Sequence, residues 1–295
     1  MFRGSTSKHC NDLLMIIYYL LIFIFGLIVG SFLNCVIYRL EKKESFLHGR
    51  SFCPNCKHSL AWYDLIPLLS FILLRRKCRY CHKSISWQYP IIETATGALF
   101  LLIFNFSAQG GQAIFNEISI FNSSAMSSLP NGFQFLNFVY YLLIACFLIV
   151  IFVYDLKHFI ILDKVLIPAI AISLIYRLVG ALFLNNQLSI INYLLSAFGA
   201  AGFFLLIYLI SKGKWLGFAD VKLVILLAMI LGWPKIALSL FLSFFIGAII
   251  GIGLIVFSGK KLKSEVPFAP FLITGTLIAL FWGQHLIDWY SALIF

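Results

Sequence analysis

Long runs of apolar residues, separated by short polar segments, dominate this 295-residue chain. A helix that crosses a bilayer needs about 20 mostly apolar residues, and eight stretches approach or reach that length. The second and fourth stretches are weaker because they contain Glu93 and Arg177, and in the sixth only twelve residues separate Lys222 from Lys235. The predicted spans are 13–38, 91–106, 133–154, 165–182, 188–211, 219–233, 236–257 and 268–287.

The composition agrees with this pattern. Hydrophobic residues make up 62% of the chain and charged residues 11%, with a mean hydropathy of +0.99. A soluble domain carries about 25% charged residues. The first apolar run, 13–38, exceeds the 7–15 residues typical of a cleavable signal peptide and is expected to remain as a helix. The chain is predicted to be an all-α polytopic membrane protein with about eight transmembrane helices.

Basic residues are concentrated on one predicted side of the membrane. Ten of the 22 Lys and Arg residues lie between residues 39 and 83, and eight more fall in loops that alternation places on the same side. The opposite loops, 107–132 and 183–187, contain none. The positive-inside rule therefore places 39–90 in the cytoplasm and both termini outside. The net charge of +11 is explained by topology, and no nucleic-acid-binding motif accompanies it.

Four cysteines in the insertion between the first two helices form two C-x-x-C pairs. They are separated by 21 residues, a spacing that favours a tetrahedral zinc site with four thiolates. Disulfides are the alternative, but they do not persist in a reducing cytoplasm. Because four thiolates leave no open position for water, the predicted zinc is structural. The predicted ligands are Cys53, Cys56, Cys78 and Cys81.

The few acidic residues are the main candidates for chemistry. Asp155 ends the third predicted span and Asp220 begins the sixth, which places both at one membrane face. Two carboxylates close together in a low dielectric would share a proton, so one can act as base on a water and the other as acid. Two alternatives remain open at this point. The acids could cap helices or pair with Lys157, Lys164 or Lys222, or they could form a proton relay in a transporter.

Six segments, in order along nearly the whole chain, resemble the type IV prepilin peptidases, a family of GxGD-type aspartyl proteases. The first is the opening segment 30–39, GSFLNCVIYR, and the second is the two cysteine pairs. Residues 85–97 follow, with Glu93 and Gly97, and then Asp155 with Asp163. The last two are 217–223, GFADVKL, and 266–271, VPFAPF.

The resemblance implies a bifunctional leader peptidase and N-methyltransferase of the bacterial inner membrane. Asp155 and Asp220 would be the catalytic pair, with Asp163, Lys222 and Gly217 in supporting positions. The substrates would be prepilins or pseudopilins, whose apolar helix lies in the membrane and whose new amino terminus is methylated from S-adenosylmethionine. The methyl donor is expected near Glu93 and Gly97. The predicted spans and loops divide the chain into a first transmembrane helix (13–38), a cytoplasmic zinc-binding insertion (39–90) and a multi-helix membrane domain (91–295), to which the resemblance assigns the peptidase.

The chain departs from the family pattern at Leu162, Ala219 and Ala269, and none of the three is expected to touch the catalytic carboxylates. Charge sign suggests that Asp64, with Glu41 and Glu44, receives the basic leader. Three alternatives are kept beside the main interpretation. They are a relative with peptidase activity only, a zinc-stabilised transporter that uses the acids as a proton relay, and a non-catalytic membrane scaffold.

Overall fold

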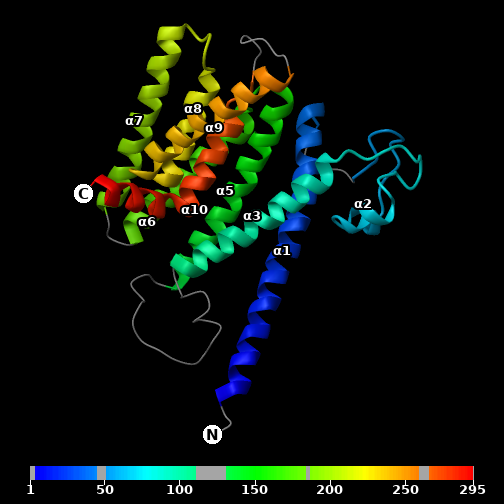
Figure 1. Cartoon of the computed structure of the whole chain (residues 1–295). Helices are drawn as coiled ribbons and strands as arrows, with labels where there is room; N and C mark the ends of the chain where they lie inside the picture. The colour runs from blue at the N-terminus through cyan, green and yellow to red at the C-terminus, as the bar shows by residue number, and fades with distance from the viewer. Residues whose placement is uncertain (1–3, 45–50, 111–130, 184–186, 259–265, 295) are drawn as a thin grey trace. The chain divides into compact units, whose positions relative to one another are not determined.

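The computed structural model describes residues 4–44, 51–110, 131–183, 187–258 and 266–294, and these are almost entirely helical (Figure 1). Within these ranges there is no strand, only isolated bridges at Phe52–Ser59 and Lys77–Ser84. The predicted all-α class is confirmed. The helices are α1 (Gly4–Lys42), η1 (Trp62–Leu65), α2 (Leu69–Leu73), α3 (Gln88–Gly110), α5 (Asn131–His158), α6 (Asp163–Phe183), α7 (Gln187–Ser211), α8 (Phe218–Leu231), α9 (Lys235–Ser258) and α10 (Ala269–Ile294).

Seven of these helices, within the described residues, are long and apolar enough to cross a membrane. They are α1, α3, α5, α6, α7, α9 and α10. The sixth predicted span, 219–233, is the exception. It corresponds to α8, whose 14 residues extend about 21 Å, less than the ~30 Å of a hydrocarbon core. Most of the predicted loop 107–132 lies outside the described residues.

The chain forms two compact units, Met1–Ile149 and Val150–Phe295. The first contains α1, the insertion, α3 and the beginning of α5. The second contains the end of α5 and the helices from α6 to α10. The division into 13–38, 39–90 and 91–295 stays a prediction.

In the first unit, α1 packs closely against α3 through glycines. A Cβ atom at Gly26 would lie 2.7 Å from the Cα atom of Gly97, and one at Gly30 would lie 2.8 Å from the Cα atom of Glu93. Small residues spaced four apart let two membrane helices approach to backbone contact. The Gly26-x-x-x-Gly30 pair on α1 therefore sets the distance between these two helices.

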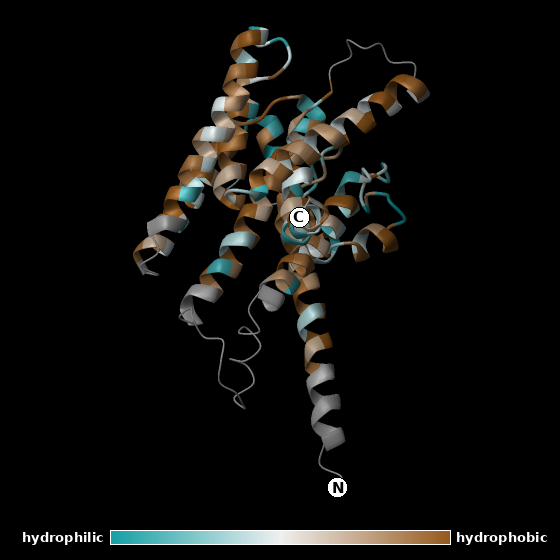
Figure 2. Ribbon diagram, turned by 60° about the vertical axis from the view of Figure 1, so that its left-hand side comes forward, coloured by the Kyte–Doolittle hydropathy of each residue, from teal (hydrophilic) through white to brown (hydrophobic). Residues whose placement is uncertain are grey.

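In the second unit, α8 is the central helix. It contacts α6, α7, α9 and α10, and its residues from Val221 to Leu231 are almost all buried (Figure 1). It is apolar around its whole circumference, which is typical of a helix enclosed by protein. Hydropathy colouring shows the surrounding helices as largely brown along their length (Figure 2). A helix of only 14 residues is accommodated here because its neighbours enclose it.

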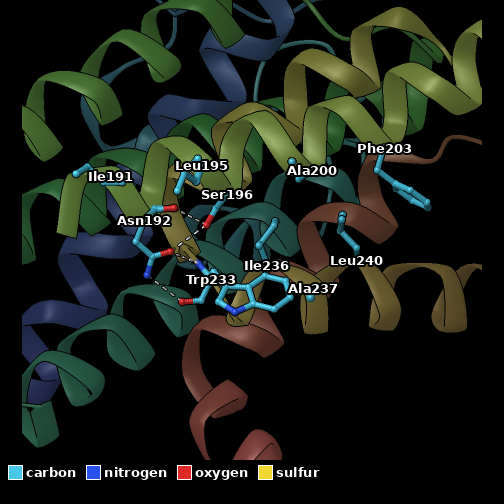
Figure 3. Close-up of a pocket in the computed structure, with 11 residues that line it drawn as sticks. Ile191, Asn192, Leu195, Ser196, Ala200, Phe203, Trp233, Ile236, Ala237 and Leu240 are labelled. Atoms are coloured by element: carbon cyan, nitrogen blue, oxygen red, sulfur yellow. Dashed lines mark hydrogen bonds between the residues drawn. The ribbon is translucent and has the colours of Figure 1, made fainter. Parts of the chain in front are cut away.

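The end of α8 is held by polar side chains from two neighbouring helices. The guanidinium group of Arg177 on α6 donates hydrogen bonds to the carbonyl oxygens of Met229 (2.9 Å) and Ile230 (2.8 Å). On α7, the amide of Asn192 accepts from the backbone N–H of Trp233 and donates to its carbonyl (Figure 3). Non-helical backbone at membrane depth needs such partners. Arg177 is the charged residue that made the fourth span a less certain prediction. Its guanidinium group supplies hydrogen-bond donors to the carbonyl groups at the end of α8.

A groove of about 540 Å³ lies beside this link, between α7 and the start of α9 (Figure 3). Its walls are mostly apolar, and Asn192 and Ser196 supply polar groups near Trp233. None of the predicted site residues lines it.

Candidate active site and metal centre

Asp155 lies in the last turn of α5, where the apolar span gives way to polar sequence. The residue is buried, with 5% of its surface exposed. Its carboxylate accepts a hydrogen bond from the backbone N–H of Ala269, the first residue of α10. The first N–H groups of a helix have no intrahelical partner and favour a negative charge. The start of α10 therefore holds this carboxylate in place.

The contact with Ala269 corrects one sequence prediction. The three departures from the family pattern were expected to lie away from the catalytic carboxylates, yet Ala269 touches Asp155 through its backbone. The prediction failed because it considered side chains alone. The sequence did indicate a backbone donor here, because Pro267 and Pro270 flank a helix start, where free N–H groups are expected.

Asp220 lies in the first turn of α8. Its carboxylate accepts a hydrogen bond of 3.1 Å from the backbone N–H of Gly217, the residue that precedes the helix. A Cβ atom at Gly217 would lie 3.3 Å from the Oδ2 atom of Asp220, so the glycine leaves room for this close approach. Ala219 is part of the helix, where an alanine is well accommodated.

The structure brings these two acids together. The Asp155 and Asp220 carboxylates interact electrostatically, although 65 residues separate them in sequence. They come from the end of α5 and the start of α8, so these two helix termini lie at the same end of the second unit. Two like charges within electrostatic range in a partly buried setting disfavour simultaneous ionisation, which favours a shared proton. This arrangement can supply a base and an acid in one site.

Asp163 and Lys222, which were predicted to support the catalytic pair, form an ion pair. The Nζ atom of Lys222 lies 2.9 Å from both carboxylate oxygens of Asp163. The pair connects the first turn of α6 to α8, two residues beyond Asp220. Both side chains are partly exposed, so it contributes little to stability, about 0–1 kcal/mol. Its effect is to fix α6 beside the start of α8.

In the first unit, the four predicted metal ligands converge. The Sγ atoms of Cys53, Cys56, Cys78 and Cys81 all lie within 4.8 Å of one another, and Cys53 Sγ is 3.9 Å from Cys81 Sγ. Zinc bound tetrahedrally at about 2.3 Å requires sulfur–sulfur distances of about 3.8 Å. The cluster therefore has the size and the donor set of a four-thiolate zinc site.

The two C-x-x-C turns are built alike. In each, the residue after the second cysteine, Lys57 or His82, has a positive φ, and its N–H donates to the carbonyl of the first cysteine. Burial disfavours the Cys53 thiolate, but hydrogen bonds from the backbone of Cys56 and Asn55 outweigh it and lower the pKa of this thiol to about 7. The repeated geometry presents both sulfur pairs to one point.

Other predicted residues have structural partners in this unit. Asp64 is engaged by Arg79 at 2.9 Å and its side chain is 3% exposed, so the expectation that it receives a basic leader is wrong. Glu93 accepts hydrogen bonds from the backbone N–H of Leu68 (2.9 Å) and from Ser31. A Cβ atom at Gly97 would lie 2.8 Å from the ring of Phe23. The proposed role of Glu93 and Gly97 in binding the methyl donor stays a prediction.

Two protein-family models match the chain. The bacterial peptidase A24 N-terminal domain matches residues 24–106, and the type IV leader peptidase family matches residues 142–252. No solved structure gave a significant match.

Similar full-length proteins carry the name prepilin leader peptidase/N-methyltransferase. The protein from Legionella pneumophila is 30% identical, over 92% of this chain and 94% of its own. Those from Aeromonas hydrophila and Bacillus subtilis are each 28% identical, over 93% and 92% of this chain and 94% and 96% of their own. With its paired aspartates and its cysteine cluster, the chain belongs to the type IV leader peptidase family.

Proposed function

We propose that this chain removes the leader peptide of prepilins or pseudopilins by a two-aspartate mechanism. The observation that carries the proposal is the convergence of Asp155 and Asp220, each held by a backbone N–H at the start of a helix. Family membership supports the same activity. A proton-relay transporter would also bring the two acids together, but it does not account for family membership, and a scaffold accounts for neither observation.

The paired carboxylates supply general acid–base catalysis. One carboxylate takes a proton from a water, whose oxygen attacks the scissile carbonyl carbon. The other donates its proton to the leaving nitrogen, so the peptide bond breaks into an acid and an amine. The backbone N–H groups of Ala269 and Gly217 orient the two carboxylates and stabilise their shared negative charge. No covalent intermediate is needed.

The second proposed activity is methylation of the new amino terminus. S-adenosylmethionine would supply the methyl group, and the names of the relatives support this activity over a peptidase-only function. We place the donor near Glu93 and Gly97. The cysteine cluster would hold a structural zinc ion, which its donor set and size fit.

The basic loops support a bacterial inner-membrane location with the aspartates and the insertion in the cytoplasm. Eighteen of the 22 basic residues fall on that side under the proposed topology. The substrate's apolar helix would then enter the bilayer directly beside the cleaved bond.

Mass spectrometry of a co-expressed prepilin tests both activities. With the wild-type chain we expect loss of the leader and a gain of one methyl group on the new amino terminus. Asp155→Asn and Asp220→Asn should each abolish cleavage, whereas Asp288→Asn, an exposed acid on α10, should leave it unchanged. Cleavage that survives both active-site substitutions would exclude the aspartyl mechanism. Cleavage without the methyl group would exclude the transferase activity alone.

A further inference from the structure

The short helix α2 in the insertion exposes apolar side chains. Leu69, Ile72 and Leu73 are 55%, 70% and 72% exposed, whereas Phe71 points inward and is buried. Figure 2 colours this helix as hydrophobic. An exposed group of large aliphatic side chains marks an interaction surface. Leu69, Ile72 and Leu73 together form the α2 face.

A hydrogen bond attaches α2 to α3. The backbone N–H of Leu68, the residue before α2, donates to the carboxylate of Glu93 at 2.9 Å. Glu93 is the sixth residue of α3, so it lies about 8 Å along the axis from the start of this helix. Because α3 is long and apolar enough to cross a membrane, α2 is anchored near the end of a candidate membrane span.

The packing of α1 places this attachment within a second membrane helix's length. Gly30 of α1 lies beside Glu93 of α3, and α1 continues for twelve more residues, to Lys42. These residues extend about 18 Å beyond that level. Figure 1 shows α2 below the C-terminal end of α1, alongside the helix. The α2 face is thus held beside two helices that are long and apolar enough to cross a membrane.

Basic residues continue directly from this face. Arg75, Arg76 and Lys77 follow α2 and are all exposed. The guanidinium group of Arg76 lies 4.7 Å from the ring centroid of Trp87, just before α3. Tryptophan is enriched at membrane interfaces, and basic clusters beside a membrane helix attract anionic lipids.

From this placement we propose that the insertion docks on the bilayer. The α2 face inserts between the acyl chains, and Arg75, Arg76 and Lys77 bind anionic phospholipid headgroups. The lipid surface is favoured over a protein because the face is attached beside two candidate membrane helices and is continued by three exposed basic residues. The docking goes beyond the enzymatic activities and does not depend on them.

Photocrosslinking in nanodiscs tests this docking with the full-length protein. The substitution Ile72→p-benzoylphenylalanine is made, and the protein is reconstituted in equal parts of phosphatidylcholine and phosphatidylglycerol. After irradiation, we expect a covalent adduct with the mass of one phospholipid. The positive control is the same substitution at Ile28, an exposed position of α1, and the negative control is Asn55 in the first cysteine turn.

The outcomes separate the occupants of the α2 face. A lipid adduct at residues 72 and 28 but not at 55 supports the proposal. An adduct at residue 28 without one at 72, or a crosslink from 72 to another protein chain, overturns it.

A second comparison tests the role of charge. Adducts formed at Leu73 should contain phosphatidylglycerol in about threefold excess over phosphatidylcholine, since three basic residues lie beside it. In the triple variant R75Q/R76Q/K77Q the excess should disappear, while the total yield of lipid adduct persists. An unchanged lipid ratio would overturn the headgroup part of the proposal.

Discussion

A single backbone N–H, that of Ala269, holds one of the two carboxylates. Its partner Asp155 is almost fully buried, so the orientation of this acid depends on the few polar groups that reach it. A hydrogen bond to a charged group contributes about 1.5–3 kcal/mol. Position 269 supplies a backbone donor to Asp155, and its own small side chain is fully buried.

Ala269→Pro should therefore reduce cleavage while the helix start is retained. Proline is well accepted at the first position of a helix, but a ring carbon replaces the N–H that Asp155 accepts. We expect the rate of leader cleavage to fall by about 10- to 100-fold. The matched control, Ala269→Gly, keeps the N–H and should cleave at nearly the wild-type rate. Equal rates for both variants would show that this hydrogen bond has no role.

At the scale of elements, the contact between α1 and α3 depends on glycine. The closest approach is at Gly26 and Gly30, where even a methyl group would meet the backbone of the neighbouring helix. By contrast, nothing lies within 4 Å of a Cβ atom built at Gly251 in α9. Substitution by alanine should therefore destabilise the protein at Gly30 but not at Gly251.

Gly30→Ala is expected to destabilise the protein by about 1–3 kcal/mol, because α1 and α3 must separate to admit the methyl group. Gly251→Ala should be neutral or stabilising, since alanine favours the helix and the space is open. Thermal unfolding in detergent measures both. A Gly30→Ala protein as stable as the wild type would contradict the close helix contact.

Some helices could be predicted from the sequence and one could not, because different interactions determine their lengths. The long spans followed from hydropathy alone, including α3 and α6 despite Glu93 and Arg177. The short length of α8 could not be derived, because Gly232 and Pro234 end a helix only in a context that satisfies the freed backbone. That context comes from Arg177 and Asn192, on helices distant in sequence.

At the scale of the whole molecule, metal removal should affect a restricted part of the chain. Between α1 and α3, the described part of the insertion (51–87) contains only the short helices η1 and α2, whereas the described segments outside it are mostly long helices. A strong chelator, or the variant Cys78→Ser, should release the metal and expose the insertion to protease. The far-UV circular dichroism should change little. Elemental analysis should find one zinc per chain in the wild type, and a large loss of helix on chelation would contradict this picture.

In the candidate site, the functional side chains could be predicted from the sequence, but their hydrogen-bond partners could not. Asp155, Asp220 and the four cysteines were identified from motif and spacing, and the structure brings each set together. The partners of these groups were missed, because the backbone of Ala269 and Leu68 carries no side-chain signature. Asp64 was misassigned for a related reason, since its pairing with Arg79 depends on how the insertion folds.

The glycine contact between α1 and α3 also affects the order in which the first unit assembles during its synthesis. Gly97 follows its contact Gly26 by 71 residues, so the ribosome makes the whole insertion before the partner of α1 exists. At about 5–20 residues per second, this interval lasts roughly 4–14 s. During it, the glycine face of α1 has no α3 to pack against, and Leu68 has no Glu93 to bind. The first unit is therefore completed late in its own synthesis, when α3 enters the bilayer and joins both partners at once.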